Sequence, residues 1–386
     1  MAGPRIRVMV CDDSVVIRRL VSDVLSGDPD IEVVGTAVNG KNALDKIPSL
    51  KPDVLTLDVE MPVMDGLQTL VELRRTFKKL PVIMFSTLTE RGAGATLDAL
   101  ERGASDYVTK PANVGSVSES MEAVRSQLIP KIKSLTGRGP LPTRPARPAF
   151  LTPGPPGQPG ESGPIGPLPP RAPQTRVDIV CIGVSTGGPD ALTTVVSALP
   201  ANFPVPILVT QHMPPVFTQL FAQRLNGKAK LHVTEAVQGD AVIPGRILVA
   251  PGDHHMRVVQ KGNGPVVQMD QGPQENYCRP AVDPMFRSVA QVYGNRALAL
   301  IMTGMGGDGA KGAEQIIRAG GSLMVQDEAT SVVWGMPGAA VAAGLPCDVL
   351  PLERIAGALV ARTTGAARPA VAGGSPRVTA AMGRPS

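Results

Sequence analysis

Acidic side chains follow two apolar runs near the start of the chain. Asp12 and Asp13 follow the run at 6–10, and Asp58 follows the run at 54–57. Because the carboxyl ends of parallel strands share one edge of a sheet, we expect these carboxylates to lie together there. Carboxylates that crowd in this way repel one another unless a hard cation lies among them, and their oxygen atoms suit Mg²⁺.

A hydroxyl and an ammonium group stand at the ends of two further apolar runs. Thr87 follows the run at 82–85, and Lys110 follows the run at 106–108. At the same sheet edge, these groups could bind the oxygens of a phosphoryl group. A single acid near a strand end is usually a helix N-cap or simply solvated, so the prediction depends on all of these positions together.

A serine with small neighbours stands farther along the chain. Ser185 lies in the segment Gly-Val-Ser-Thr-Gly-Gly at 183–188, which follows an apolar run and opens a helical pattern. A strand–turn–helix of this kind exposes the serine Oγ, and the helix N-terminus offers N–H groups to an oxyanion. The same glycines could cradle a phosphate in a dinucleotide fold. No Walker-type lysine follows, however, and no acid clearly takes the ribose role, so this alternative ranks low.

A serine nucleophile needs a base, and the base needs an orienting acid. Of the four histidines, His212 follows the run at 205–210 on the same predicted edge as the serine, and His255 is the alternative base. Asp308, in the glycine-rich segment 303–309, follows another run and is the candidate acid, although such an acid is often only an N-cap. The glycines around it could supply N–H groups to an oxyanion hole.

Two α/β regions are needed to position these residues. From residue 6 to 128, short apolar runs alternate with helical patterns, the clearest at 17–25 with Ser14 as a plausible N-cap. This alternation predicts a parallel sheet covered by helices on both faces. A second α/β region begins at residue 177. Apolar runs near 231–234 and 258–269 suggest an antiparallel hairpin on its mostly parallel sheet.

Two stretches have compositions that cannot build a core. Residues 137–174 hold 13 Pro and 7 Gly in 38 positions, which predicts a flexible linker with polyproline II character. Glycine at every third position from Gly154 to Gly166 resembles a collagen repeat, but so few triplets favour a linker over a triple helix. Residues 363–386 are rich in Ala, Gly, Pro and Arg and are predicted to form a disordered tail.

Charge and composition exclude several function classes. The net charge is +5, and 137–174 and 363–386 contribute +3 each, so the remaining chain carries −1. We therefore expect no basic folded face and no binding of nucleic acid. The four cysteines are far apart and indicate neither a zinc site nor a disulfide framework. The sequence predicts no signal peptide and no apolar run of about 20 residues, so we expect a cytoplasmic protein.

The acidic cluster and its companions give residues 5–125 a clear resemblance to a response-regulator receiver domain, which has a flavodoxin-like fold. The resemblance implies that Asp58 is the phospho-acceptor, Thr87 the switch hydroxyl and Lys110 the lysine that pairs with the phosphate. It also implies a Mg²⁺ site, whose ligands would be three carboxylates and one backbone carbonyl, those of Asp12, Asp13, Asp58 and Glu60.

Residues 177–362 closely resemble the catalytic domain of the chemotaxis-type protein-glutamate methylesterase (CheB) family. The matching stretches are 182–188, 211–214, 250–252 with 255–256, 279–283 and 303–309. The resemblance implies a Rossmann-like hydrolytic domain with an antiparallel hairpin. The resemblance implies that Ser185 is the nucleophile, His212 its base and Asp308 the partner acid. It also implies that Thr186 neighbours the site and that the Met305 amide is an oxyanion donor.

Together, the two resemblances imply a receiver domain at 5–128, a Pro/Gly-rich linker at 129–176, a catalytic domain at 177–362 and a tail at 363–386. The implied function is removal of methyl groups from glutamates of chemoreceptors, with deamidation of receptor glutamines, in chemotaxis adaptation. A chemotaxis-type histidine kinase would phosphorylate the receiver. The unphosphorylated receiver would cover the active site, and phosphorylation would release it. The hydrolase chemistry needs no cofactor, and contact with the membrane would be peripheral, through the receptor.

Two alternatives stay open. The enzyme could act on proteins of another pathway, or the chain could be a phosphorylation-dependent binding protein with an inactive hydrolase domain. The intact Ser185, His212 and Asp308 argue against the second. A DNA-binding output is excluded, because the second region lacks a helix-turn-helix pattern and is far too long. The linker is longer and richer in Pro and Gly than the family pattern, and we predict that it weakens inhibition by the receiver.

Overall fold

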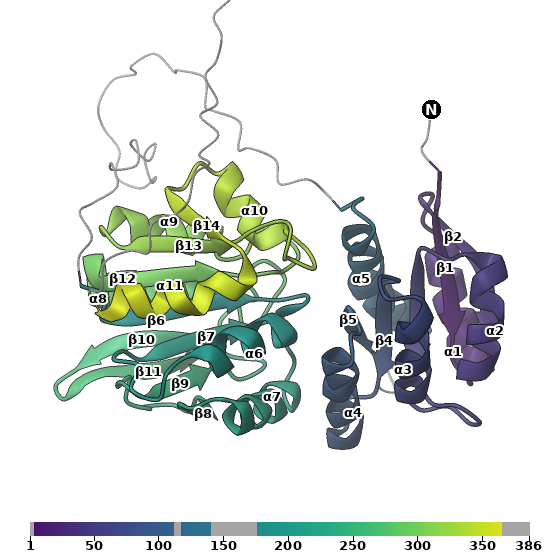
Figure 1. Cartoon of the computed structure of the whole chain (residues 1–386), viewed down its shortest axis with the longest axis horizontal. Coiled ribbons are helices and arrows are strands. Elements are labelled where there is room, and N and C mark those ends of the chain that lie inside the picture. The colour runs from purple at the N-terminus through teal and green to yellow at the C-terminus, as the bar shows by residue number, and fades with distance from the viewer. Residues whose placement is uncertain (1–3, 112–116, 140–175, 365–386) are drawn as a thin grey trace, which may run out of the picture.

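The computed structural model describes residues 4–111, 117–139 and 176–364 (Figure 1). We call 4–139 the receiver region and 176–364 the hydrolase region. Each has a parallel sheet with helices on its faces, as predicted. Most of the predicted linker and nearly all of the predicted tail lie outside the described residues.

The receiver region contains one five-stranded parallel sheet with the strand order β2-β1-β3-β4-β5. Its strands are β1 (Ile6–Cys11), β2 (Ile31–Ala37), β3 (Val54–Asp58), β4 (Val82–Ser86) and β5 (Asp106–Thr109). Its helices are α1 (Val15–Ser26), α2 (Gly40–Leu50), α3 (Gly66–Thr76), α4 (Glu90–Glu101) and α5 (Val117–Leu135). This order is that of flavodoxin-like folds, which confirms the predicted fold class.

Local sequence explains why α1 begins where it does and how it packs. The Ser14 hydroxyl accepts a hydrogen bond from the Ile17 N–H, so Ser14 is the N-cap, as predicted. Val21, Val24 and Leu25 form the buried face of the helix, at the spacing of one helical face. The neighbouring strand β3 is buried along its whole length, as expected for a central parallel strand between two helical layers.

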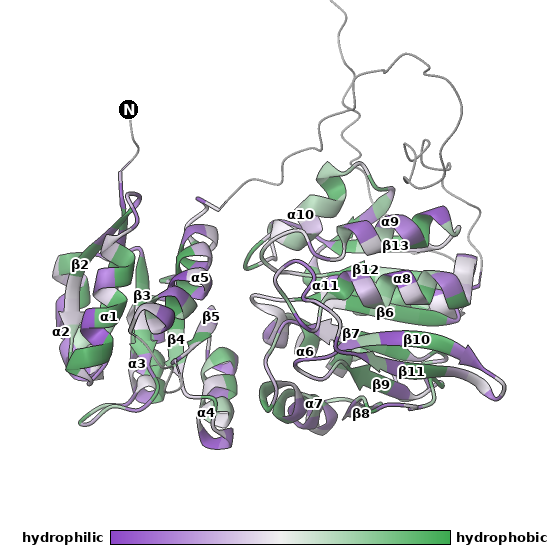
Figure 2. Ribbon diagram, turned by 180° about the vertical axis from the view of Figure 1, so that it is seen from behind, coloured by the Kyte–Doolittle hydropathy of each residue, from purple (hydrophilic) through white to green (hydrophobic). Residues whose placement is uncertain are grey.

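The hydrolase region contains a seven-stranded parallel sheet with the order β14-β13-β12-β6-β7-β9-β8. Its strands are β6 (Ile179–Val184), β7 (Ile207–Gln211), β8 (His232–Glu235), β9 (Arg246–Val249), β12 (Ala297–Ile301), β13 (Ser322–Gln326) and β14 (Cys347–Leu350). The helices are α6 (Gly188–Ala198), α7 (Phe217–Lys228), α8 (Val282–Tyr293), α9 (Ala310–Arg318), α10 (Gly335–Ala342) and α11 (Leu352–Thr364), with a 3₁₀ turn at Gly294–Arg296. Strands β6 and β12 are mainly apolar along their length (Figure 2).

The structure contains an antiparallel hairpin, as predicted, but one of the two predicted runs is not part of it. Strands β10 (His255–Lys261) and β11 (Gly264–Asp270) pair with each other in a separate two-stranded sheet. The other predicted run, around 231–234, instead forms β8, which pairs with β9 in the parallel direction. The sequence of a short apolar run does not show which strand it pairs with, so the prediction joined two neighbouring runs into one hairpin.

The order of strands in the hydrolase sheet places a topological switch point at β6. From β6 the chain first proceeds to β7 on one side, and later returns to β12 on the other side. In open parallel sheets, ligands bind beyond the carboxyl ends of the strands at such a point. The functional site is therefore expected where β6, β7 and β12 end.

The receiver region ends later than predicted. Helix α5 continues to Leu135, so residues 129–135, assigned above to the linker, belong to the folded receiver region. Ile129 and Ile132 are buried against the same apolar cluster as the first strands, which explains the longer helix. At the other end of the chain, α11 reaches Thr364, so the first residues assigned to the tail are helical. No helix in the described ranges is long and apolar enough to cross a membrane.

Candidate active site

Ser185 lies in the tight turn between β6 and α6. Its backbone N–H donates to the Thr303 carbonyl, 3.0 Å away, and its own carbonyl accepts from Gly188 at 2.8 Å. The turn needs glycine at 187, where φ is +75° and a Cβ would lie 2.6 Å from Val332. These contacts hold the serine at the carboxyl edge of the sheet, at the switch point.

His212 and Asp308 form the pair that the sequence predicted. They follow β7 and β12, the two strands beside β6, and the His212 Nε2 lies 2.8 Å from the Asp308 Oδ2. Asp308 is almost fully buried. Its carboxylate also accepts hydrogen bonds from the backbone N–H groups of Val282, Asp283 and Gly309 at 2.6, 3.1 and 2.9 Å. It therefore serves as more than the N-cap of a helix.

The electrostatics of this pair favour an ionised acid beside a basic imidazole. Burial opposes ionisation of Asp308, but hydrogen bonds from His212 and backbone N–H groups outweigh it and lower the pKa of the carboxyl group. Burial likewise opposes protonation of His212, but Cys278 and Asp308 beside the ring outweigh it and raise the pKa of His212. The Asp308 carboxylate, whose oxygen lies 2.8 Å from the ring, is a fixed negative charge that favours the protonated imidazole.

Two groups of the candidate site, the Ser185 hydroxyl and the predicted oxyanion donor, lack within the described ranges the partners that catalysis would require. No hydrogen bond joins the Ser185 hydroxyl to His212 in the described part of the chain, a looseness common before substrate binds. The Met305 N–H likewise has no partner among the described residues, and it lies in the turn between β12 and Asp308. An N–H group left free at this edge can stabilise an oxyanion.

The other histidines have different roles. His255, the alternative base, is buried, with its Nε2 2.9 Å from the Pro273 carbonyl and its Nδ1 accepting from the Ala281 N–H at 3.2 Å. Both ring nitrogens are therefore engaged in holding a loop. His232 is exposed in β8, and His254 lies 3.2 Å from the Gly252 carbonyl. The geometry thus supports His212 as the base.

The receiver region brings its predicted acids together. Oxygen atoms of Asp12, Asp13 and Asp58 all lie within 4.8 Å of one another. The Lys110 Nζ lies 2.8 Å from Asp58 and 3.1 Å from Asp12. Burial raises the pKa of Asp58 to about 6, with help from the charge of Asp12 and against the hydrogen bond from Lys110.

The acidic cluster fits a hard divalent cation. The Asp12 Oδ2 is buried and accepts no hydrogen bond, although the Lys110 Nζ lies 3.1 Å from it. A buried carboxylate oxygen among other carboxylates is a suitable ligand for Mg²⁺. The backbone N–H of Glu60 hydrogen-bonds to Asp58, and the role of the Glu60 carbonyl as a further ligand stays a prediction.

Thr87 does not join the acidic cluster. Its side chain is exposed, and its hydroxyl lies 3.0 Å from that of Thr89, the N-cap of α4. The structure therefore places this predicted switch residue at the rim of the site, bonded to the helix that follows it.

Comparisons with known proteins agree with both sites. The family model described as CheB methylesterase matches residues 180–359, and that described as response regulator receiver domain matches residues 8–122. A protein-glutamate methylesterase/protein-glutamine glutaminase of Nocardioides sp. is 52% identical over 349 residues, covering 90% of this chain and 93% of its own length. One of the same name from Trichodesmium erythraeum is 47% identical and covers 93% of this chain and 99% of its own.

The chain belongs to the CheB methylesterase family. The solved structure of the CheB methylesterase catalytic domain of Thermotoga maritima is 41% identical, covers 48% of this chain and 98% of its own, and has a TM-score of 0.47. The two family models match the two regions in turn, so the CheB chain combines a receiver domain with a methylesterase domain, as the sequence predicted.

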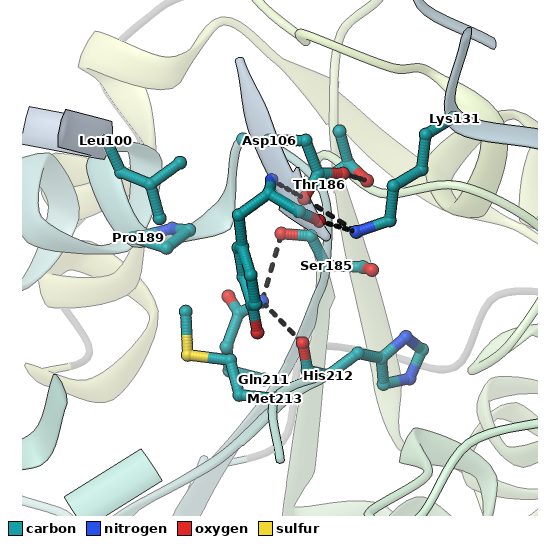
Figure 3. Close-up of a pocket in the computed structure, with 11 residues that line it drawn as sticks. Leu100, Asp106, Lys131, Ser185, Thr186, Pro189, Gln211, His212 and Met213 are labelled. Atoms are coloured by element: carbon teal, nitrogen blue, oxygen red, sulfur yellow. Dashed lines mark hydrogen bonds and ion pairs between the residues drawn. The ribbon is translucent and has the colours of Figure 1, made fainter. Parts of the chain in front are cut away.

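In this CheB chain the receiver domain lies over the candidate active site (Figure 3). The Thr186 hydroxyl, next to Ser185, donates to the Asp106 carboxylate at the start of β5, at 2.5 Å. Lys131 of α5 holds Asp106 from the other side at 2.8 Å. The cavity left beside Ser185 and His212 measures about 20 Å³. That volume admits about one water molecule and no ester side chain.

Apolar and charged contacts surround this buried hydrogen bond. The rings of Tyr107 and Phe217 stack with centroids 4.8 Å apart, within one apolar cluster that runs through both domains. At the edge, Arg224 of α7 lies 2.6 Å from Asp98 and also donates to the Gly94 carbonyl at 2.8 Å. Lys228 pairs with Glu101 at 2.9 Å. Helix α4 of the receiver domain is thus fastened to α7 of the methylesterase domain.

Sequence reasoning missed several residues of the CheB site. The Asn276 amide donates to Asp308 at 2.8 Å and to Asp283 at 3.0 Å. Burial raises the pKa of Asp283 to about 6, with the charge of Asp308 as the next cause. The run at 279–283 was noted only as a matching stretch, and nothing in the spacing of Asn276 pointed to the acid 32 residues later.

Proposed function

We propose that this CheB chain hydrolyses glutamyl methyl esters on chemoreceptors, with Ser185 as nucleophile, His212 as base and Asp308 as the acid that orients the base. The observation that carries the proposal is the His212–Asp308 hydrogen bond beside Ser185, at the ends of three neighbouring strands at a switch point. The same arrangement of roles recurs in hydrolases of unrelated folds.

The steps follow from these positions. The Ser185 Oγ attacks the ester carbonyl while its proton passes to the His212 imidazole. The C–O bond to the methoxy group then breaks, and the imidazolium returns the proton so that methanol leaves and an acyl-enzyme remains. Water attacks the acyl-enzyme with the same imidazole as base, which frees glutamate and restores Ser185. With a glutamine side chain, ammonia leaves in place of methanol.

The roles of the neighbouring groups are part of the proposal. The free N–H of Met305 would stabilise the negative oxygen of the tetrahedral intermediate. Asp308 stays ionised and fixes the imidazole tautomer, since its low pKa leaves it no proton to give. Thr186 neighbours the site, where its hydroxyl is bonded to the receiver domain instead of to substrate.

Regulation by the receiver domain is proposed on the closed arrangement described above. The cavity beside Ser185 and His212 admits about one water molecule, which supports a resting state in which the receiver domain restricts the access of receptor side chains. We propose that phosphorylation of Asp58 by a chemotaxis-type histidine kinase drives this movement through Thr87 and Lys110. Mg²⁺ held by Asp12, Asp13, Asp58 and the Glu60 carbonyl would neutralise charge during phosphoryl transfer.

The remaining assignments are also proposals. Domains at 5–128 and 177–362, the first lengthened to Leu135, would be joined by a linker whose length weakens docking only slowly. The described cysteines are free thiols, which suits the reducing cytoplasm as the place of action.

Methanol release from methylated chemoreceptor membranes tests this function. Wild-type protein and Ser185→Ala would be compared with and without a small phosphodonor and Mg²⁺. We expect release that requires Ser185 and rises with the phosphodonor. Absence of release from folded wild-type protein under all conditions would favour another substrate or the binding-protein alternative.

A further inference from the structure

One exposed aromatic residue stands beside the proposed triad. Tyr277 is 97% exposed, and it is the only exposed aromatic side chain among the described residues. Its neighbours in the chain both reach the triad. The Asn276 amide donates to Asp308 at 2.8 Å, and the Cys278 side chain lies within hydrogen-bonding reach of the His212 imidazole. Tyr277 is thus attached directly to the rim of the active site.

The backbone around Tyr277 is unfavourable for a tyrosine. Asn276 and Tyr277 have φ angles of +52° and +62°, and Glu275 and Cys278 exchange hydrogen bonds of 3.1 and 2.9 Å across them. Positive φ at both central residues is the mark of a type I′ turn, which favours Asn at the first position and Gly at the second. Asn276 follows this preference, whereas Tyr277 contradicts it.

The turn is nevertheless firmly held. Arg287 of α8 makes two hydrogen bonds to the Glu275 carboxylate, of 2.6 and 2.8 Å. On the other side, Arg279 pairs with Asp253 at 2.6 Å. The surroundings thus force the strained conformation, and strain that is maintained in this way marks functional positions. No packing contact explains the choice of tyrosine, because its side chain is in solvent.

We propose that Tyr277 is a specificity-determining residue that contacts the receptor beside the esterified glutamate. This inference rests on the proposed function. An enzyme that acts on one side chain of a large protein gains rate from contacts outside the reacting group. Tyrosine suits such a contact, because it offers a large amphipathic surface and loses little conformational freedom on binding. Its exposure with the receiver domain in place leaves it accessible before the active site opens.

The test compares Tyr277→Gly and Tyr277→Phe with wild type in the full chain, activated by a small phosphodonor. Glycine removes the ring and also relieves the backbone strain, so thermal stability should be equal or higher. We expect the kcat/KM for methanol release from methylated receptor to fall about tenfold in Tyr277→Gly and to stay within about threefold in Tyr277→Phe. The rate at which a fluorophosphonate labels Ser185 should be unchanged.

Lys51→Gly is the matched control. Lys51 is an exposed residue with φ of +45° at the end of α2, far in sequence from the active site, and its change relieves the same kind of strain. It should leave receptor kinetics unchanged. Equal kcat/KM values for methylated receptor in wild type and Tyr277→Gly would overturn this inference and leave the proposed function intact. A parallel loss of fluorophosphonate labelling would also overturn it, in favour of a structural role. Absence of methanol from every protein would overturn the proposed function and this inference with it.

Discussion

Two buried carboxylates, Asp58 of the receiver domain and Asp308 of the methylesterase domain, lie at carboxyl ends of parallel strands, yet their pKa values move in opposite directions. Asp58 is 2% exposed and Asp308 is 1% exposed, so burial alone does not separate them. Asp58 faces the like charge of Asp12 and has one ammonium partner. Asp308 receives several N–H groups and an imidazole.

This difference teaches what each site is built to do. An acid whose charge is incompletely compensated, as at Asp58, attracts a cation and is sensitive to what binds next to it. An acid surrounded by fixed donors, as at Asp308, keeps its charge through a reaction cycle and can orient a base. The first arrangement suits a switch and the second suits a catalyst.

The largest expected effect comes from removing the fixed charge of the second site. Asp308→Asn should lower the kcat/KM for methanol release by about 10³- to 10⁴-fold, because the imidazole loses its correct tautomer and its counter-charge. Fluorophosphonate labelling of Ser185 should fall with it. A loss below about tenfold, in a variant with native thermal stability, would contradict the role of Asp308.

Removing the uncompensated charge of the first site should stabilise the protein. The folded pKa of Asp58 is raised from 3.8 to about 6, so the native state holds the proton more tightly and the ionised group costs stability above that pH. Asp58→Asn should therefore raise the free energy of unfolding by about 3 kcal/mol at pH 7 without divalent cations. Urea titrations at pH 7 and pH 4 measure this.

The advantage of Asp58→Asn should shrink as the pH falls through about 6, where wild-type Asp58 becomes protonated. The variant should also lose its response to the phosphodonor. A variant less stable than wild type at pH 7 would show that the pairing of Asp58 with Lys110 outweighs the cost of burial.

A smaller effect is expected from loosening the contact between the two domains. Arg224→Glu places a negative charge against Asp98 and Glu101. Since partly exposed ion pairs contribute up to about 1 kcal/mol each, methanol release without phosphodonor should rise about tenfold. Adding Asp98→Arg should restore the low rate.

Arg318→Glu is a matched control for Arg224→Glu. Arg318 has similar exposure but pairs with Glu314 in its own helix, so its change should leave the unstimulated rate unaltered. Equal rates in Arg224→Glu and Arg318→Glu would argue against a closed resting state held by α4 and α7.

The smallest expected effect is a shift in the acid limb of the plot of kcat/KM against pH. The pKa of His212 is raised above its usual value of 6.5, so kcat/KM should fall as the pH drops through a midpoint above 6.5. Cys278→Ser should move this midpoint by less than about half a pH unit, because the Asp308 carboxylate still lies 2.8 Å from the ring. A midpoint at or below 6.5 in wild type would contradict a lasting influence of Asp308.

Much of both sites could be predicted because their residues follow apolar runs, and parallel strands bring such positions to one edge. Asp12, Asp58 and Lys110 meet as expected, and so do His212 and Asp308. The rest depends on contacts between distant segments, which periodicity does not encode. Asn276 comes from an irregular loop, and Asp106 faces the other domain. The predicted pairing of the run that forms β8 was wrong for the same reason.

The order of the domains along the chain has a consequence for biosynthesis. Domains generally fold as they emerge from the ribosome, the N-terminal one first. The receiver sheet, complete with Asp106 and Tyr107 on β5, therefore exists before β6 and Ser185 are translated. If the closed arrangement silences the enzyme, each newly made molecule meets its inhibitor as its catalytic edge forms. The cell then never holds a nascent, uncontrolled esterase.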